Sequence, residues 1–295
     1  MSAASTALPN RGLIPVQTPA AAVPPANAFF VILRANFVAD VKFLRRSRLI
    51  MAFVLVFLVI TVLSLLPSAF GQSEFKSFGT MEQIYGELRL FLAILAGGMG
   101  LFLVSFHQRD RSLKMVFTKP CTPANWLLAA MLSASFVSFV LNVVICAVMV
   151  GLSYGWHLAV RPGLMFLACE SVIVDIIVIS TMTLLASLVH PAVAATVAIL
   201  FNGNLFYSFL QWSLQTIAEG NKTLKMRALE HFFHALYMII PMYSPFGKHI
   251  DSVDGSYRVE HGQWKYLAFS LGYALTFALV AYLVALLSLR RKRHI

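Results

Sequence analysis

Six long apolar runs constrain this chain more than any other feature of its sequence. They cover roughly residues 49–66, 90–106, 126–152, 164–189, 191–212 and 266–289. An α-helix rises about 1.5 Å per residue, so about 20 apolar residues cross the hydrocarbon core of a bilayer. The chain is 59% hydrophobic and 12% charged, and that charged share is about half of what soluble domains carry. The sequence therefore predicts an all-α polytopic membrane protein with six transmembrane helices, which form a domain over residues 49–289.

The ends of two runs need separate consideration. The second run is short unless Glu87, Leu88 and Arg89 lie at the membrane interface. The fourth and fifth runs are divided only by His190 and Pro191. Proline is tolerated at the first position of a helix because its missing N–H needs no partner there. We therefore expect a tight turn at His190. The runs do not alternate as the strands of a transmembrane β-barrel do, so a barrel is disfavoured.

The chain before the first run divides into two parts. Residues 1–27 are rich in Ala, Pro and Ser, and their prolines interrupt any helix, which predicts a disordered tail. Residues 28–48 repeat apolar side chains at three- and four-residue spacing, and most of their basic residues fall off that stripe. This pattern is typical of an amphipathic helix in the plane of the lipid headgroups, with its basic residues toward anionic lipid.

The distribution of lysine and arginine predicts the orientation in the membrane. With six spans, both termini share one side, which carries 14 basic and two acidic residues, against nine basic and eight acidic on the other side. Cytoplasmic segments carry the excess of basic residues. The termini, the loop 107–125 and the basic tail 290–295 are therefore expected in the cytoplasm, with the protein integral to the plasma (inner) membrane. This distribution accounts for the net charge of +11 without any binding of nucleic acid.

The longest loop, 213–265, is then expected outside the cytoplasm. Its residues 226–240 hold an apolar stripe with prolines behind it, which favours a re-entrant or interfacial helix pair that dips into the outer leaflet. Glu230, His231 and His234 are the grouping most suggestive of a metal. No third ligand is evident near the two histidines, however, and histidines at this spacing on an aromatic-rich helix more often pack at an interface. The three cysteines, Cys121, Cys146 and Cys169, show neither metal-site nor disulfide spacing. We predict no metal site.

Polar residues inside the runs are candidates for function, because carboxyl groups are unfavourable in lipid and usually face a bundle interior or a cavity. Glu170 and Asp175 lie five residues apart in the fourth run, so on a helix they point about 140° from each other and do not form one paired acid–base site. Each either belongs to a cation-friendly or proton-linked patch, or is a neutral or hydrogen-bonded group facing a neighbouring helix. For Glu170 we favour the second alternative, and for Asp175 both stay open.

Two further groups are candidates for lining a pathway. Asn202 and Asn204 flank a glycine within the fifth run, where amides either join helices by hydrogen bonds or line a pathway. Gly97, Gly98 and Gly100 in the second run are small enough to let helix backbones approach closely. Plain helix packing explains these glycines at least as well as a pathway does.

The loop between the second and third runs combines basic and apolar residues. Its core reads Leu-Lys-Met-Val-Phe over 113–117, between Arg109-Asp-Arg-Ser and Lys119-Pro-Cys-Thr-Pro. The basic residues alone agree with the charge rule for cytoplasmic loops. The apolar core does not follow from that rule, and it indicates a short amphipathic helix that contacts a partner.

This layout resembles the membrane subunits of ABC-2 type exporters over residues 28–293. Those subunits have an amphipathic elbow helix, six spans with cytoplasmic ends, a coupling loop between spans two and three, and re-entrant helices before span six. The coupling loop is the sharpest local match. The family commonly has a Gly-Thr pair early in this loop and a Ser-Arg pair after the proline, where this chain has Ser112 and Cys121-Thr122-Pro123.

The resemblance implies a permease subunit that moves a hydrophobic or amphipathic substrate by alternating access. No Walker A pattern is present, so ATP and Mg²⁺ would be bound by a separate ATPase, and this chain would be no enzyme and bind no cofactor. The permease would act as a homodimer or a heterodimer, with a pathway lined mainly by spans two and five. The residues expected to couple it to the ATPase are Arg109, Arg111, Leu113, Lys114, Met115, Val116, Phe117, Lys119 and Pro120.

Two other classes of function compete with transport. A membrane scaffold or assembly subunit that anchors a cytoplasmic partner explains the basic loop and termini equally well. An intramembrane enzyme acting on lipids would need His, Asp, Glu or Cys residues clustered at a membrane face, and the sequence has no such cluster at a credible spacing. The permease is therefore the preferred hypothesis and the scaffold is its alternative.

Overall fold

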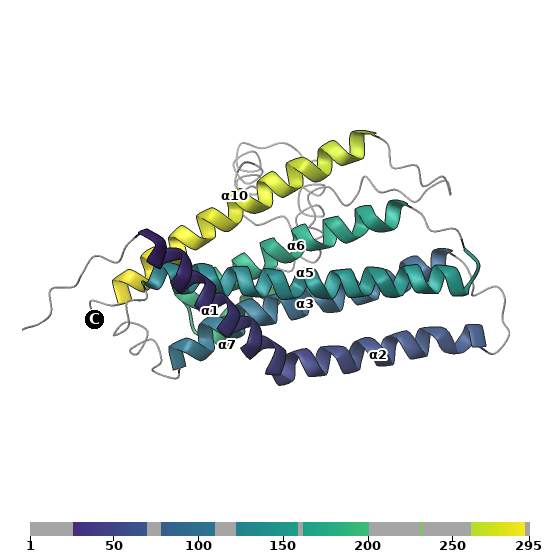
Figure 1. Ribbon diagram of the computed structural model, residues 1–295, viewed down its shortest axis with the longest axis horizontal. Coiled ribbons are helices and arrows are strands. Elements are labelled where there is room, and N and C mark those ends of the chain that lie inside the picture. The colour runs from purple at the N-terminus through teal and green to yellow at the C-terminus, as the bar shows by residue number, and fades with distance from the viewer. Residues whose placement is uncertain are drawn as a thin grey trace, which may run out of the picture.

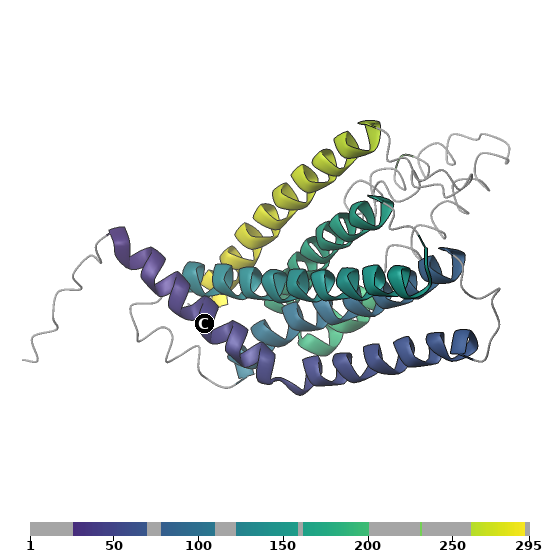
Figure 2. The same cartoon turned by 45° about the vertical axis from the view of Figure 1, so that its right-hand side comes forward.

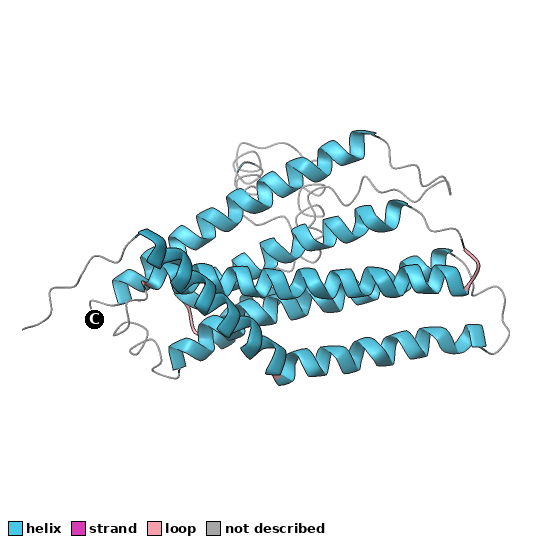
Figure 3. Cartoon of the chain, in the orientation of Figure 1, coloured by secondary structure: helices cyan, strands magenta, loops and turns pink. Residues whose placement is uncertain are grey.

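The computed structural model describes residues 26–69, 78–109, 122–158, 162–200, 231 and 261–292. Within these ranges all regular secondary structure is helical (Figure 3). The helices are α1 (Ala26–Arg46), α2 (Arg48–Ala69), α3 (Phe78–Arg109), α5 (Pro123–Gly155), α6 (Pro162–Leu188), α7 (Pro191–Leu200) and α10 (His261–Lys292). The prediction of an all-α protein is confirmed for this part of the chain.

Four of these helices are long and apolar enough to cross a membrane. Their qualifying segments are Ile84–Ser105, Pro123–Gly155, Leu164–Leu188 and Trp264–Arg291. There is a fifth candidate span if two further segments are taken together as one, namely Phe29–Arg46 and Ile50–Leu63, whose axes differ by 49°. The chain is thus an integral membrane protein. The predicted first run lies within α2, and the predicted fifth run is described only as far as Leu200.

The long helices run lengthwise beside one another, and α1 crosses them obliquely (Figure 1). Figures 1 and 2 show α10 lying along α6, and α3 lying beside α5. Toward one end of the bundle, α3 ends, α5 begins, α6 turns into α7 and α10 ends. We call this the α5-start end. Two hydrogen bonds join helices there, from the Tyr282 hydroxyl to the Ala124 carbonyl (3.2 Å) and from the Ser288 hydroxyl to the Ser187 carbonyl (3.1 Å).

The largest apolar core lies between α3, α5 and α6. Leu88, Leu92 and Met99 of α3 are fully buried in it, together with Met149 of α5 and Ile179 of α6. A second cluster at the α5-start end joins α3, α5, α6 and α10 and includes Val104, Leu127 and Ala285. Outside these clusters, large apolar side chains of α2 and α10 are exposed, such as Leu55 at 68% and Phe269 at 71%. Such a surface suits helices whose outer faces meet lipid.

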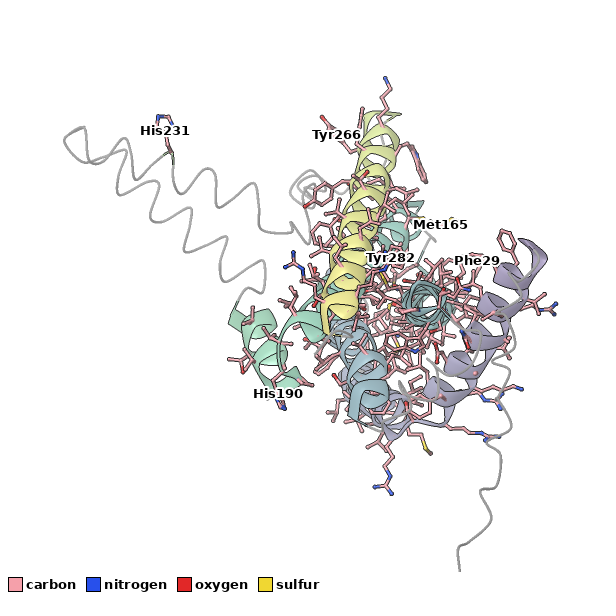
Figure 4. The ribbon with its side chains drawn as sticks, turned by 90° about the vertical axis from the view of Figure 1, so that its left-hand side faces the viewer. Phe29, Met165, His190, His231, Tyr266 and Tyr282 are labelled. Atoms are coloured by element: carbon pink, nitrogen blue, oxygen red, sulfur yellow. The ribbon has the colours of Figure 1, made fainter. Side chains whose placement is uncertain are left out.

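The amphipathic helix predicted over 28–48 is α1, and much of its apolar stripe is covered by protein. Leu44 is fully buried, and the Phe43 ring stacks on Phe102 of α3 at 5.4 Å between centroids. Phe37 meets Phe136 of α5 edge-on at 5.6 Å. Only the start of the stripe is open, since Phe29 at the outer end of α1 (Figure 4) is 41% exposed. The second half of α1 is thus fixed to the bundle by aromatic contacts.

The helix starts follow from local chemistry. The Thr122 side chain accepts a hydrogen bond from the Asn125 N–H at 3.3 Å, and Pro123 is the first residue of α5. These are favourable capping and first-turn residues. The predicted turn at His190 is present, because α6 ends at Leu188 and α7 begins at Pro191. There the His190 Nδ1 accepts from the Ala192 N–H at 3.3 Å.

The first residues of two helices differ from those expected. The second predicted run began at residue 90, but α3 starts at Phe78 and passes straight through Leu88 and Arg89. Leu88 is fully buried there, so this stretch packs within the bundle as an ordinary part of the helix. Residues 261–265, predicted as the end of a loop, are the first turn of α10. Periodicity and hydropathy predict a helix well but locate its ends poorly when polar residues continue it.

Candidate functional site

A buried polar group joins α5 and α6 in the interior of the bundle. Asp175 of α6 is 1% exposed, and its Oδ2 accepts hydrogen bonds from the Ser138 hydroxyl and from the Asn142 Nδ2 of α5. The second of these bonds is 2.7 Å long. Ser138 and Asn142 are themselves 1% and 3% exposed. Because they lie four residues apart on α5, they present both donors on one helix face.

A second carboxylate on α6 has a different partner. Glu170 Oε2 lies 3.2 Å from Arg89 Nη1 of α3, in an ion pair with side chains 9% and 24% exposed. The prediction that Glu170 and Asp175 do not share one acid–base site agrees with this geometry. Glu170 faces α3 and Asp175 faces α5. The interpretation of Glu170 as a group hydrogen-bonded to a neighbouring helix also agrees with it.

Several other hydroxyl groups in the long helices are satisfied by their own helix. Ser180 and Thr181 donate to the carbonyl oxygens of Ile176 and Ile177, at 2.6 and 2.8 Å. Thr276 of α10 donates to Gly272 in the same way. A hydroxyl that bonds back by four residues needs no other element. The side-chain bonds of Asp175 and Glu170 instead cross between helices, and so they contribute to how α3, α5 and α6 are held together.

Three buried oxygen atoms near these bonds have no hydrogen-bond partner among the described residues. They are Oδ1 of Asp175, the hydroxyl of Ser171 and the phenolic oxygen of Tyr85 on α3. All three residues are at most 4% exposed. Ser171 lies four residues before Asp175, and thus on the same face of α6. Buried polar atoms without partners are uncommon and call for an explanation.

The electrostatics of the site follow from these partners. Arg89 and Glu170 compensate each other's charge. The two groups that bond to Asp175, a hydroxyl and an amide, carry no net charge. A carboxylate in a low-dielectric interior is strongly unfavourable without a counter-charge. The site can therefore bind a positively charged species or a proton at Asp175.

The structure places the predicted pathway glycines in a helix contact. A Cβ atom added to Gly97 would lie 3.1 Å from a methyl group of Val178, and one added to Gly100 would lie 2.9 Å from the carbonyl oxygen of Ile179. Gly97 and Gly100 thus allow α3 to approach α6 closely, and Gly98 beside them is half-buried. Their part in a pathway stays a prediction. Asn202 and Asn204 lie outside the described residues.

Most of the predicted coupling segment also lies outside the described residues. Arg109 is the last residue of α3, and α5 begins at Pro123, so the helices confine the connecting segment to residues 110–122. The predicted roles of Arg111, Leu113, Lys114, Met115, Val116, Phe117, Lys119 and Pro120 stay predictions. Of the three residues considered for a metal, only His231 is described, and it is exposed (Figure 4).

Three residues of the site were missed in the sequence. Ser138 and Asn142 are polar residues four apart within an otherwise apolar run, and that spacing was a usable signal for a polar helix face. Arg89 was considered only as a possible interface residue, and its ion pair with Glu170 of α6 was not predicted. Its partner is 81 residues away, and nothing local to Arg89 points to it.

Comparisons with known proteins add no assignment. No family model matches the chain, and no curated protein matches it.

Proposed function

We propose that this chain is the membrane-spanning subunit of an ATP-driven exporter of the ABC-2 type. In this proposal a separate cytoplasmic ATPase binds ATP and Mg²⁺. The chain forms six spans with both termini in the cytoplasm, in the plasma (inner) membrane, and pairs with a second copy or a homologue. It moves a hydrophobic or amphipathic substrate by alternating access. The proposal rests on the resemblance in layout, and the arrangement of the helix ends supports it.

The observation that carries the proposal is the composition of the α5-start end. The C-terminus of α3 and the N-terminus of α5 both lie there, so the segment 110–122 is joined to the bundle at this end. Exposed Arg290 and Arg291 lie in the last turn of α10, at the same end of the bundle. Arg45, Arg46 and Arg48, at the junction of α1 and α2, are also exposed. A basic surface of this kind suits both a cytoplasmic location and an acidic docking surface.

A contact in this segment would act directly on two core helices. α3 and α5 both pack against α6, and the capped start of α5 fixes the direction in which the chain enters that helix. A movement of the bound ATPase would therefore be passed to α3 and α5 first. In the proposed cycle, ATP binding closes the ATPase pair, the segment shifts, and α3 and the fifth span rearrange to open outward.

The test is the variant Phe117→Asp in the apolar core of the segment. Burying a phenylalanine contributes about 1.5–3 kcal/mol, so we expect ATPase stimulation by the permease in liposomes to fall at least about tenfold. The melting temperature and membrane insertion of the variant should match those of the native chain. The control Phe117→Leu keeps an apolar side chain and should retain most of the stimulation.

Two outcomes would contradict the proposal. Full ATP-driven transport by well-folded Phe117→Asp would remove the segment from the coupling path. Co-purification of a cytoplasmic partner without any permease-dependent ATPase activity, for the native chain, would favour the alternative of a membrane scaffold. That alternative uses the same basic end as an anchor and requires no pathway.

A further inference from the structure

We propose that Asp175 is a proton-binding site inside the bundle, which carries a proton at neutral pH and in that state joins α6 to α5. This inference goes beyond transport and holds whether the chain is a permease or a scaffold. It rests on the burial of Asp175, on the chemistry of its two partners, and on the placement of the other ionisable groups that face it among the described residues.

The burial of Asp175 makes an unbalanced charge unfavourable. Asp175 is 1% exposed, and its helix α6 is packed against α3, α5 and α10. The two donors on α5 stabilise either form of the carboxyl group, because the oxygen of a neutral acid also accepts hydrogen bonds. They supply no positive charge. A carboxylate in such a setting is ordinarily neutralised by a cation or by a proton.

Within the part of the chain that the structure describes, the helices packed against α6 offer no free counter-charge near Asp175. They are α3, α5, α7 and α10. Arg89 of α3 is paired with Glu170 of α6 itself, and the facing titratable groups Tyr85 of α3 and Cys146 of α5 are neutral when protonated. The segment described as α7 contains no ionisable residue.

The basic residues of α10 lie far along its axis. Ala274 of α10 packs with Ile173 and Ile177, on either side of Asp175 in the sequence. Lys265 is nine residues before Ala274, about 13 Å along the helix at 1.5 Å per residue, and Arg290 is still farther away. Tyr273, next to Ala274, is a neutral phenol that stacks on Phe277. With Arg89 and Glu170 cancelling each other, an ionised Asp175 would leave this region with an excess negative charge.

A proton fits the open oxygen better than a metal ion does. Hard cations gather six or more oxygen ligands, whereas Oδ2 of Asp175 already accepts two hydrogen bonds and only Oδ1 is open. A proton needs a single oxygen. Bound to Oδ1, it makes the carboxyl a donor, and the hydroxyl of Ser171 on the same helix face is a buried group that has no partner among the described residues. Release of the proton to water restores the carboxylate.

Protonation should therefore favour the contact between α5 and α6. With the proton bound, the bonds from Ser138 and Asn142 join two neutral surfaces. Without it, a charge is left in the contact, and separation of the helices or entry of water becomes more favourable. The folded state then binds more protons than the unfolded state, so the stability contributed by this group falls as pH rises.

The first experiment is infrared spectroscopy of the purified full-length chain in lipid nanodiscs at neutral pH. A neutral carboxylic acid has a carbonyl band separate from the bands of a carboxylate. We expect the difference between the native chain and Asp175→Asn to contain the neutral-acid band, with a shift in D₂O. The difference between the native chain and Glu170→Gln should contain carboxylate bands, because Glu170 is ion-paired. Carboxylate bands in the Asp175→Asn difference would overturn the proposal.

A second variant keeps the test valid if Asp175→Asn does not fold. Asn142→Leu leaves Asp175 in place but removes one of its donors, so the neutral-acid band should persist and move to higher frequency. No movement of any neutral-acid band would overturn the assignment to Asp175. Melting temperature provides an independent measurement. Between about pH 5 and pH 8 the native chain should lose stability relative to Asp175→Asn, and parallel pH profiles would contradict the role in joining the helices.

Discussion

At the scale of single residues, the two carboxyl groups of α6 are accommodated in two different ways. Glu170 is matched by Arg89 on another helix, whereas Asp175 is held by uncharged donors. Breaking a buried pair by removing one member is strongly unfavourable, because the other charge stays buried without compensation. Replacing Arg89 by a neutral residue should therefore leave Glu170 charged and unpaired, whereas the partners of Asp175 carry no charge that could be removed.

The variant Arg89→Met tests the first arrangement. We expect it to lower the free energy of unfolding by about 2 kcal/mol, less than the 3–5 kcal/mol of a fully buried pair, because the Arg89 side chain is 24% exposed. The double variant Arg89→Met with Glu170→Met removes both charges and should recover most of that loss. Melting in detergent measures both, and Arg34→Met on the exposed face of α1 is the matched control. A double variant no more stable than Arg89→Met would contradict this account.

The sequence predicts part of this site at the residue scale. Glu170 and Asp175 are recognisable because carboxyl groups are rare in apolar runs, and their separation follows from the helical repeat. Their partners are not recognisable in the same way. Arg89 lies at the start of an apolar run, and only the packing of α3 on α6 shows that it pairs with Glu170.

At the scale of helices, close approach of α3 and α6 depends on the small residues of α3. The variant Gly100→Ala would place a Cβ atom 2.9 Å from the backbone oxygen of Ile179 and 3.3 Å from the Thr183 hydroxyl. The two helices must then move apart, and we expect a loss of about 1–3 kcal/mol in the free energy of unfolding. Thermal or denaturant melting in detergent measures it.

Gly151→Ala on α5 is the matched control, because nothing lies within 4 Å of its added Cβ atom. It should leave stability unchanged or raise it by up to about 1 kcal/mol through helix propensity. Equal effects of the two alanines would show that the close contact between α3 and α6 contributes little.

Sequence patterns predict the helices better than their limits and contacts. Hydropathy locates the apolar centre of each span, as in α5 and α6. It placed the start of the second run too late in the sequence, because Glu87 and Arg89 interrupt the apolar pattern. The helix α3 includes both residues. The stripe of α1 was correctly recognised as apolar, but the same stripe serves lipid or protein equally well. Its packing against Phe102 and Phe136 depends on which helices come beside it.

At the scale of the whole molecule, the helix directions place the C-termini of α3 and α10 at one end, and the C-terminus of α5 at the other (Figure 1). In a variant whose Cys121, Cys146 and Cys169 are replaced by serine, single cysteines at Met115, His294 and His157 should therefore separate into two groups. An impermeant thiol reagent should label Met115→Cys and His294→Cys from the same side, which we propose is the cytoplasm. His157→Cys should be labelled from the opposite side.

Labelling of residues 115 and 157 from one side would contradict the arrangement of α5 across the membrane. Labelling of residue 115 only from outside would keep the fold and reverse the proposed orientation. The alternation of ends follows from the apolar runs alone. Which helices pack side by side does not follow from the runs, because one apolar run resembles another. In the structure α6 packs extensively on both α3 and α10, and small residues such as Gly97 and Gly100 mark the face of α3 that approaches α6.

The start of α5 has a mechanical consequence. Thr122 closes its first turn, Pro123 restricts the backbone at its first position, and the helix then continues without interruption for 33 residues, about 50 Å at 1.5 Å per residue. A helix secured in this way does not fray at its entrance. Any displacement imposed at Thr122 would therefore reach Gly155 as motion of a stiff rod, and would not be absorbed as unwinding where it was applied.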